Sequence, residues 1–215
     1  NDTFTWCTDT ILEDLKYLDL VPVWRENVLP GFEKNIYEKY CSKVNITKLQ
    51  HLEPYFFDDP WTSYLEGKKV AVFSPFATSI SNNFKNLNKI WNNKITSNFD
   101  LTPIQYPTAI TITKDSPYNN SREIYDEMLD KVKSLDFDVG IFGTGHTGLL
   151  LALECKKIGK TGIHLGGATQ ILFGIKGNRW DKMEEFQPFF NEYWTRPLGN
   201  ETPDRIDVVE QACYW

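Results

Sequence analysis

A strand, a glycine turn, a helix and a second strand follow one another near the middle of the chain. The apolar run 137–142 predicts a buried strand, and the glycine-rich stretch 143–148 predicts a tight turn. A helix is expected from about 147 to 158, ended by Gly159, with a strand over 161–165. Because a parallel pair of strands needs a long crossover, this order predicts two parallel neighbours in one sheet.

The same alternation of apolar and amphipathic runs occurs earlier in the chain. Residues 68–74 lie between Gly67 and Pro75 and predict another strand. Ser79 is a candidate N-cap for a helix that runs from there toward Trp91. This region therefore adds a second strand-then-helix unit to the sheet.

The remaining elements complete the predicted fold. The stretch 99–112 is rich in β-branched residues but contains Pro103 and Pro107, which indicates an edge strand or an extended loop. Apolar periodicity predicts helices over 10–17, 32–40 and 121–135 and a strand over 18–24. We therefore predict an α/β protein with a Rossmann-like fold, in which a mostly parallel sheet carries helices on both faces.

Composition narrows the class of protein. The 215 residues are 41% hydrophobic and 14% aromatic, so one domain can bury a sizeable core; the absence of an initial Met suggests a domain excised from a longer chain. A net charge of −6 argues against nucleic acid as a partner. No membrane span is expected, because the longest apolar run, 148–153, is far shorter than the ~20 residues that cross a bilayer.

The cysteines indicate a reducing compartment. The four of them lie far apart and form no CxxC pair, which disfavours both a structural zinc site and a disulfide scaffold. Free thiols are typical of cytoplasmic proteins, so a cytoplasmic location is expected.

The turn 143–148 reads Gly-Thr-Gly-His-Thr-Gly, a GxGxxG motif between a strand and a helix. Glycines let the backbone approach a diphosphate, and the N–H groups that begin the helix attract its charge. The candidate phosphate-binding residues are Gly143, Thr144, Gly145, His146 and Gly148. The alternative is a turn needed only for tight packing of helix on strand. A nicotinamide dinucleotide is disfavoured, because His164 stands where a ribose-binding acid is expected.

Two further loops are expected beside this turn, since ligands of parallel sheets bind at the carboxyl ends of the strands. These loops supply the candidate donor-binding residues Ser74, Pro75, Phe76, Ser79, Gly166, Gly167 and Gln170. His164 is a candidate for binding a phosphate or for accepting a proton near neutral pH, with a purely structural role as the alternative.

Charged residues near these loops suggest further roles. Lys176 and Arg179 would neutralise a leaving diphosphate, unless they form only a solvated basic turn. Asp136 and Asp138 flank a strand at the end opposite the loops, so we assign them to structure rather than to a metal. A serine hydrolase is unsupported, because the chain has no GxSxG motif.

A longer set of motifs resembles a known family. The set includes Leu-Glu-Pro-Tyr at 52–55, the run 163–177, Arg-Trp at 179–180, and Glu210 with the terminal Cys-Tyr-Trp. Together they resemble a family of glycosyltransferases from bacterial polysaccharide gene clusters and large DNA viruses, distantly similar to the GT-D type. That resemblance implies a Rossmann-like sheet that binds a sugar nucleotide. GT-D enzymes hold a metal through an acidic DxE where this chain has 166–170 without a carboxylate, so a divalent metal is not expected to be essential.

The resemblance implies transfer of a sugar from a UDP- or dTDP-sugar to a glycan hydroxyl. Similarity to chlorella-virus enzymes that build rhamnose-containing glycans implies L-rhamnose or another deoxyhexose, and the host cytoplasm as the location. The candidate bases for the acceptor hydroxyl are Glu53, His164 and Glu210. The alternative function is a non-catalytic nucleotide- or carbohydrate-binding module, in which aromatic side chains stack on sugars.

Overall fold

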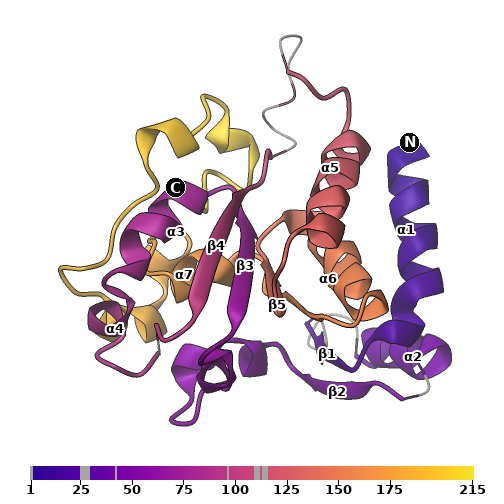
Figure 1. Ribbon diagram of the computed structural model, residues 1–215, viewed down its shortest axis with the longest axis horizontal. Helices are drawn as coiled ribbons and strands as arrows, with labels where there is room; N and C mark the ends of the chain where they lie inside the picture. The colour runs from indigo at the N-terminus through magenta and orange to yellow at the C-terminus, as the bar shows by residue number, and fades with distance from the viewer. Residues whose placement is uncertain (1, 25–29, 42, 96, 109–111, 113–115) are drawn as a thin grey trace.

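The computed structural model describes residues 2–24, 30–41, 43–95, 97–108, 112 and 116–215. At its centre lies a sheet of four parallel strands in the order β4-β3-β5-β6 (Figure 1). The strands are β3 Lys69–Ser74, β4 Asp100–Gln105, β5 Val139–Phe142 and β6 Thr161–His164. The α/β class and the Rossmann-like parallel sheet predicted from the sequence are thereby confirmed.

The chain leaves the central strand β3 in one direction and later returns to its other side. Helices α3 (Ala77–Phe84) and α4 (Leu87–Ile90) lead to β4, whereas α5 (Ser121–Ser134) leads back across the sheet to β5. Helix α6 (Gly148–Lys157) continues to β6, and α7 (Ala168–Leu172) follows. The strand order therefore reverses between β3 and β5, and open parallel sheets form their ligand crevice at such a point.

Side chains of the central strand alternate between two cores, as the two-residue period of a strand requires. Val70 and Val72 join the core formed with α3, α4 and α7. Ala71 and Phe73 join the core formed with α5 and α6. All four side chains are fully buried, so helices cover both faces of the sheet as predicted.

The helices and the strand predicted outside the central sheet are present, some of them with different ends, and one further short strand, Asn45–Lys48, was not predicted. The N-terminal helix begins well before residue 10, and the predicted strand over 18–24 pairs in parallel with a second short strand. The bounds are α1 Asp2–Asp14, β1 Leu20–Val23, α2 Phe32–Tyr40 and β2 Asn45–Lys48. No helix in the described part of the chain combines the length and the apolar character needed to cross a bilayer.

Strand β4 lies at the edge of the sheet, as its proline predicts. Pro103 lacks an N–H donor and so cannot pair on both sides, a restriction that an edge strand tolerates. The strand ends at Gln105, and residues 109–111 of the predicted extended stretch lie outside the described residues.

A residue from far along the chain, and not Ser79, caps α3. Glu201 Oε1 accepts hydrogen bonds from the N–H groups of Thr78 at 2.7 Å and Ser79 at 3.2 Å, and the Ser79 hydroxyl donates to Glu201 Oε2. A carboxylate at this position satisfies unpaired N–H groups and complements the helix dipole. The expectation that Ser79 is the N-cap is wrong, because α3 begins at Ala77 and a long-range carboxylate satisfies its N-terminus.

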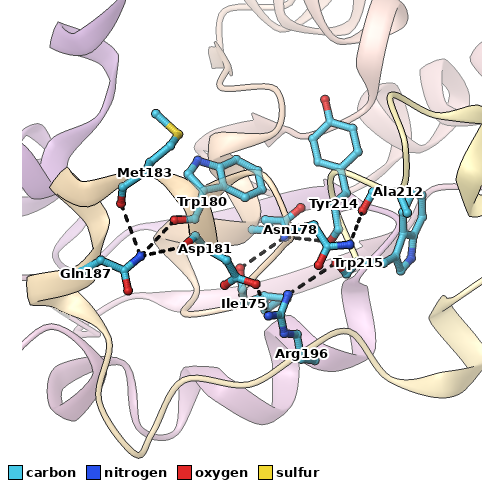
Figure 2. A network of polar contacts seen from close by, with 11 residues as sticks. Ile175, Asn178, Trp180, Asp181, Met183, Gln187, Arg196, Ala212, Tyr214 and Trp215 are labelled. Atoms are coloured by element: carbon cyan, nitrogen blue, oxygen red, sulfur yellow. Dashed lines mark hydrogen bonds and ion pairs between the residues drawn. The ribbon is translucent and has the colours of Figure 1, made fainter.

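The irregular segment after α7 is held in shape by hydrogen bonds and an ion pair between its own residues. Gln187 Nε2 donates to the carbonyl groups of Trp180, Asp181 and Met183 (Figure 2). The Asn178 N–H donates to the Trp215 carbonyl oxygen at 3.0 Å. Asn178 Nδ2 reaches the Ala212 carbonyl oxygen at 3.2 Å, and Arg196 pairs with Asp181. The segment also packs against the body, because Asn191 Nδ2 donates to the carbonyl oxygens of Lys89 and Ile90 in α4.

We expect Gly162→Ala to destabilise the protein, because a Cβ at this position would lie 2.3 Å from the carbonyl oxygen of Ala152 in α6. Forcing an extra carbon into a close-packed contact costs roughly 1–3 kcal/mol, which lowers Tm by about 2–10 °C in a protein of this size. Thermal unfolding followed by circular dichroism measures the change. The control is Thr161→Ala, whose side chain is exposed on the same strand. Equal Tm values for both variants would contradict the predicted contact.

Candidate functional site

A cavity of about 260 Å³ lies at the carboxyl ends of β3 and β5, where the strand order reverses. Three predicted loops meet there, one after each of β3, β5 and β6. They contribute ten of the predicted donor-binding residues to the cavity wall, namely Ser74, Pro75, Phe76, Gly143, Thr144, Gly145, His146, Gly166, Gly167 and Gln170. The structure therefore brings together most of the predicted donor site.

The three glycines of the GxGxxG turn have different structural roles. Gly145 has a φ of +58°, and a Cβ built on it meets nothing within 4 Å, so its backbone borders open space at the cavity. A Cβ on Gly143 would lie 2.9 Å from the Thr169 Cβ, and one on Gly148 would lie 2.4 Å from the His164 ring. Gly143 and Gly148 thus allow close packing, whereas Gly145 keeps the approach to the backbone clear.

A buried hydroxyl holds the turn in shape. Thr147 Oγ1 donates to the Thr144 carbonyl oxygen at 3.0 Å and lies 3.1 Å from the Tyr106 hydroxyl, which comes from the loop after β4. The 3₁₀ turn Gly145–Thr147 leads directly into α6, and the Gly148 N–H is bonded to the Gly145 carbonyl oxygen. The N–H groups without an intrahelical partner therefore belong to this turn, whose Gly145 and His146 line the cavity, and the positive end of the helix dipole lies next to them. The arrangement can bind an anion without a charged side chain.

His164 lies behind the turn rather than in the cavity wall. Its ring contacts the backbone of Gly148 at the start of α6. Burial lowers the pKa of His164 to about 4, although its hydrogen bond with the Gly145 backbone acts in the opposite direction. The ring is therefore neutral at pH 7 and is a weak proton acceptor.

The predicted cations lie outside the cavity wall. Arg179 forms an ion pair with Glu210, and its Cζ lies 4.9 Å from the centroid of the Tyr214 ring, which lines the cavity. Lys176 places its Nζ 4.6 Å from the centroid of the Phe190 ring. Arg179 is thus one side chain away from the cavity, and its charge is balanced by one of the predicted bases.

The three predicted bases do not meet at the cavity. Glu53 precedes Tyr55, whose ring stacks on Trp91 at 4.9 Å between centroids, and burial raises the pKa of the Glu53 carboxyl. Glu210 is exposed and holds Arg179. Ser79, a predicted donor-binding residue, is buried in α3 with its hydroxyl bonded to Glu201.

Sequence reasoning missed six residues that line the cavity. They are Tyr106, Thr108, Thr169, Val209, Tyr214 and Trp215. The position of the C-terminal residues against the glycine loops depends on long-range contacts, which local sequence patterns do not show. The Tyr214 ring approaches within 2.6 Å of a Cβ built on Gly167, so only glycine fits beneath it.

Side chains that could hold a metal do not cluster in the described residues, where no group of three or more His, Cys, Asp or Glu side chains is arranged around one point.

Comparisons with models of protein families, with curated proteins and with solved structures found no significant match. The family resemblance therefore stays a prediction.

The pH dependence of stability should report the environment of His164. Between pH 6.5 and pH 4 an unfolded chain protonates this residue and the folded protein does not, so stability falls as the pH falls through this window. We expect wild type to lose up to roughly 3 kcal/mol more than His164→Gln over this range, measured by urea unfolding at several pH values. His51→Gln, at an exposed histidine, is the control and should follow wild type. If the free energy of unfolding changes equally with pH in wild type and His164→Gln, the lowered pKa of His164 is contradicted.

Proposed function

We propose that this protein is a glycosyltransferase that binds a nucleoside diphosphate sugar in the cavity between β3 and β5. The observation that carries the proposal is the open backbone of Gly145 beside the N-terminus of α6, at the switch point of a parallel sheet. The aromatic side chains of Phe76, Tyr106 and Trp215 add flat surfaces against which a base or a sugar ring can stack.

In the proposed reaction, a glycan hydroxyl oxygen forms a bond to the anomeric carbon while the bond from that carbon to the diphosphate breaks. The departing diphosphate keeps the bonding electron pair. Backbone N–H groups of the turn and of α6 stabilise its charge, and Arg179 adds a positive field across the Tyr214 ring. The ion pair with Glu210 holds Arg179 in place while reducing its net field.

The acceptor proton needs a base, and His146 is better placed than the three candidates named from the sequence. It is the one histidine among the described residues that line the cavity, and partial desolvation lowers its pKa. A neutral imidazole at pH 7 has a free lone pair that can take the proton.

The alternative is a non-catalytic module that binds a nucleotide or a carbohydrate. It is favoured by one observation: no carboxylate lies among the described residues that line the cavity. A binding module needs no base and would retain the same backbone cradle. Turnover distinguishes the two functions, because only the enzyme releases free nucleoside diphosphate.

Donor binding should depend on the open space at Gly145. We expect UDP- or dTDP-sugars to raise the Tm of wild type, NAD to leave it unchanged, and Gly145→Val to bind at least 10-fold more weakly in calorimetric titrations. The matched control is Gly159→Val, because both glycines have positive φ and no neighbour near a built Cβ, but Gly159 lies at the far end of α6. Both variants carry similar backbone strain. If Gly145→Val retains wild-type affinity, the turn serves packing alone.

Turnover should be insensitive to chelators and sensitive to Arg179. We expect initial rates of nucleoside diphosphate release to persist in excess EDTA, and Arg179→Ala to lower kcat by about 100-fold with a smaller change in donor affinity, since charge builds on the leaving group in the transition state. Arg205→Ala, at an exposed arginine, is the control. Complete loss of activity in EDTA, with Arg179→Ala harmless, would assign leaving-group stabilisation to a metal.

A further inference from the structure

Three polar atoms in residues of the cavity wall are buried without a hydrogen-bond partner among the described residues. They are Thr144 Oγ1, Thr169 Oγ1 and Gln170 Oε1. The three residues are only 1–2% exposed. Native proteins rarely leave buried polar groups unpaired, and their gathering at one cavity calls for a physical reason.

The orientation of Gln170 determines what it can bind. Its Nε2 donates to the carbonyl oxygens of Ile175 at 3.3 Å and Tyr214 at 3.0 Å. The reverse amide orientation would place an oxygen against those two carbonyl oxygens and is excluded by repulsion. Oε1 is therefore a pure acceptor, and only a group that carries a proton can pair with it.

The two threonine side chains lie against glycines of the turn. Thr169 Oγ1 lies 3.0 Å from a Cβ built on Gly143, and Thr144 Oγ1 lies 3.1 Å from one built on Gly148. Thr147, in the same turn, is fully buried but bonded to both the Thr144 carbonyl and the Tyr106 hydroxyl. Within the turn, therefore, the unpaired hydroxyl belongs to Thr144, which lines the cavity, and the paired one belongs to Thr147, which does not.

We propose that Thr144, Thr169 and Gln170 form a specificity wall that recognises a ligand by its O–H or N–H donors. This inference rests on the proposed function and deepens it. A diphosphate offers only acceptor oxygens near pH 7, so it suits the backbone N–H groups at Gly145 but cannot pair with Gln170 Oε1. The wall instead recognises an uncharged, proton-bearing part of the same ligand: a sugar hydroxyl or the imide N–H of a uracil or thymine base.

A change of threonine rotamer connects the buried hydroxyls to the ligand. Rotation about the Cα–Cβ bond exchanges the hydroxyl with the methyl group or the hydrogen, and threonine occupies more than one such rotamer readily. In the unliganded protein the buried hydroxyls make no hydrogen bond, which costs free energy. A ligand that pairs with them recovers this free energy when it binds. Binding is favoured because the groups that it satisfies had no partner before.

The test compares Thr144→Val and Thr169→Val with the matched control Thr147→Val. Without ligand, the first two variants should raise Tm by about 2–4 °C, because each removes an unpaired buried hydroxyl, whereas Thr147→Val should lower it. Calorimetric titrations then use UDP-glucose, dTDP-rhamnose, UDP, uridine, methyl glucoside and inorganic pyrophosphate. The first two variants should weaken UDP-glucose or dTDP-rhamnose binding about 10-fold and pyrophosphate binding less, because pyrophosphate has neither the sugar nor the base and can use only the donor capacity of a threonine hydroxyl.

The titrations separate the sources of the donor and the two proposals. Weakened binding of UDP and uridine assigns the donor to the base, whereas weakened binding of the nucleotide sugars and methyl glucoside alone assigns it to the sugar; either result supports the inference. If nucleotide sugars bind wild type and both variants equally, or if both variants lose Tm as Thr147→Val does, the specificity wall is overturned and the proposed function stands. If only neutral ligands bind, and do so through the wall, the proposed function is overturned instead. Absence of binding by every probe overturns both.

Discussion

The contact between α6 and β6 determines the geometry of the candidate site. Gly162 brings the strand so close to the backbone of Ala152 that a single added carbon would collide with a carbonyl oxygen. One turn earlier, at the start of the same helix, the backbone of Gly148 rests on the His164 ring. These two contacts hold the first half of the helix against the sheet, and they position its N-terminus and the preceding turn at the edge where the strand order reverses between β3 and β5. The cavity and its backbone donors depend on this packing.

Local patterns were sufficient to predict the sheet. The runs that form β3, β5, α6 and β6 are short in sequence, their apolar periodicity is strong, and each is bounded by glycine or proline. The cap of α3 could not be predicted in this way, because Glu201 lies more than 120 residues from the N–H groups that it accepts from. The preference for serine at helix N-caps favoured Ser79 at this position, but the buried carboxylate of Glu201 accepts the hydrogen bonds instead. Tertiary contact overrode a local preference for the same hydrogen bonds.

The candidate site was predictable to the extent that loops at strand ends must converge. Ten of the residues predicted to bind a donor line one cavity, because parallel strands bring their carboxyl ends together. It could not show that Arg179 and Glu210 neutralise each other, since their pairing depends on a backbone turn in which Glu210, Gln211 and Ala212 all have positive φ. Sequence rules assign such angles to glycine, so this turn had no signal. It also determines where Tyr214 and Trp215 meet the cavity.

Tyr214 and Trp215 line the cavity but lie far along the chain from the glycine turn. This separation in sequence has a consequence for the order of folding. Tyr214 is tied to Gln170 across 44 residues, whereas β5 and β6 pair across only 22, from Val139 to Thr161. Closing a longer loop has a larger entropic cost and is slower. In refolding, the β5-α6-β6 unit and its glycine turn would thus form before the completed cavity, and the protein would regain part of its secondary structure before it regains the ability to hold a ligand.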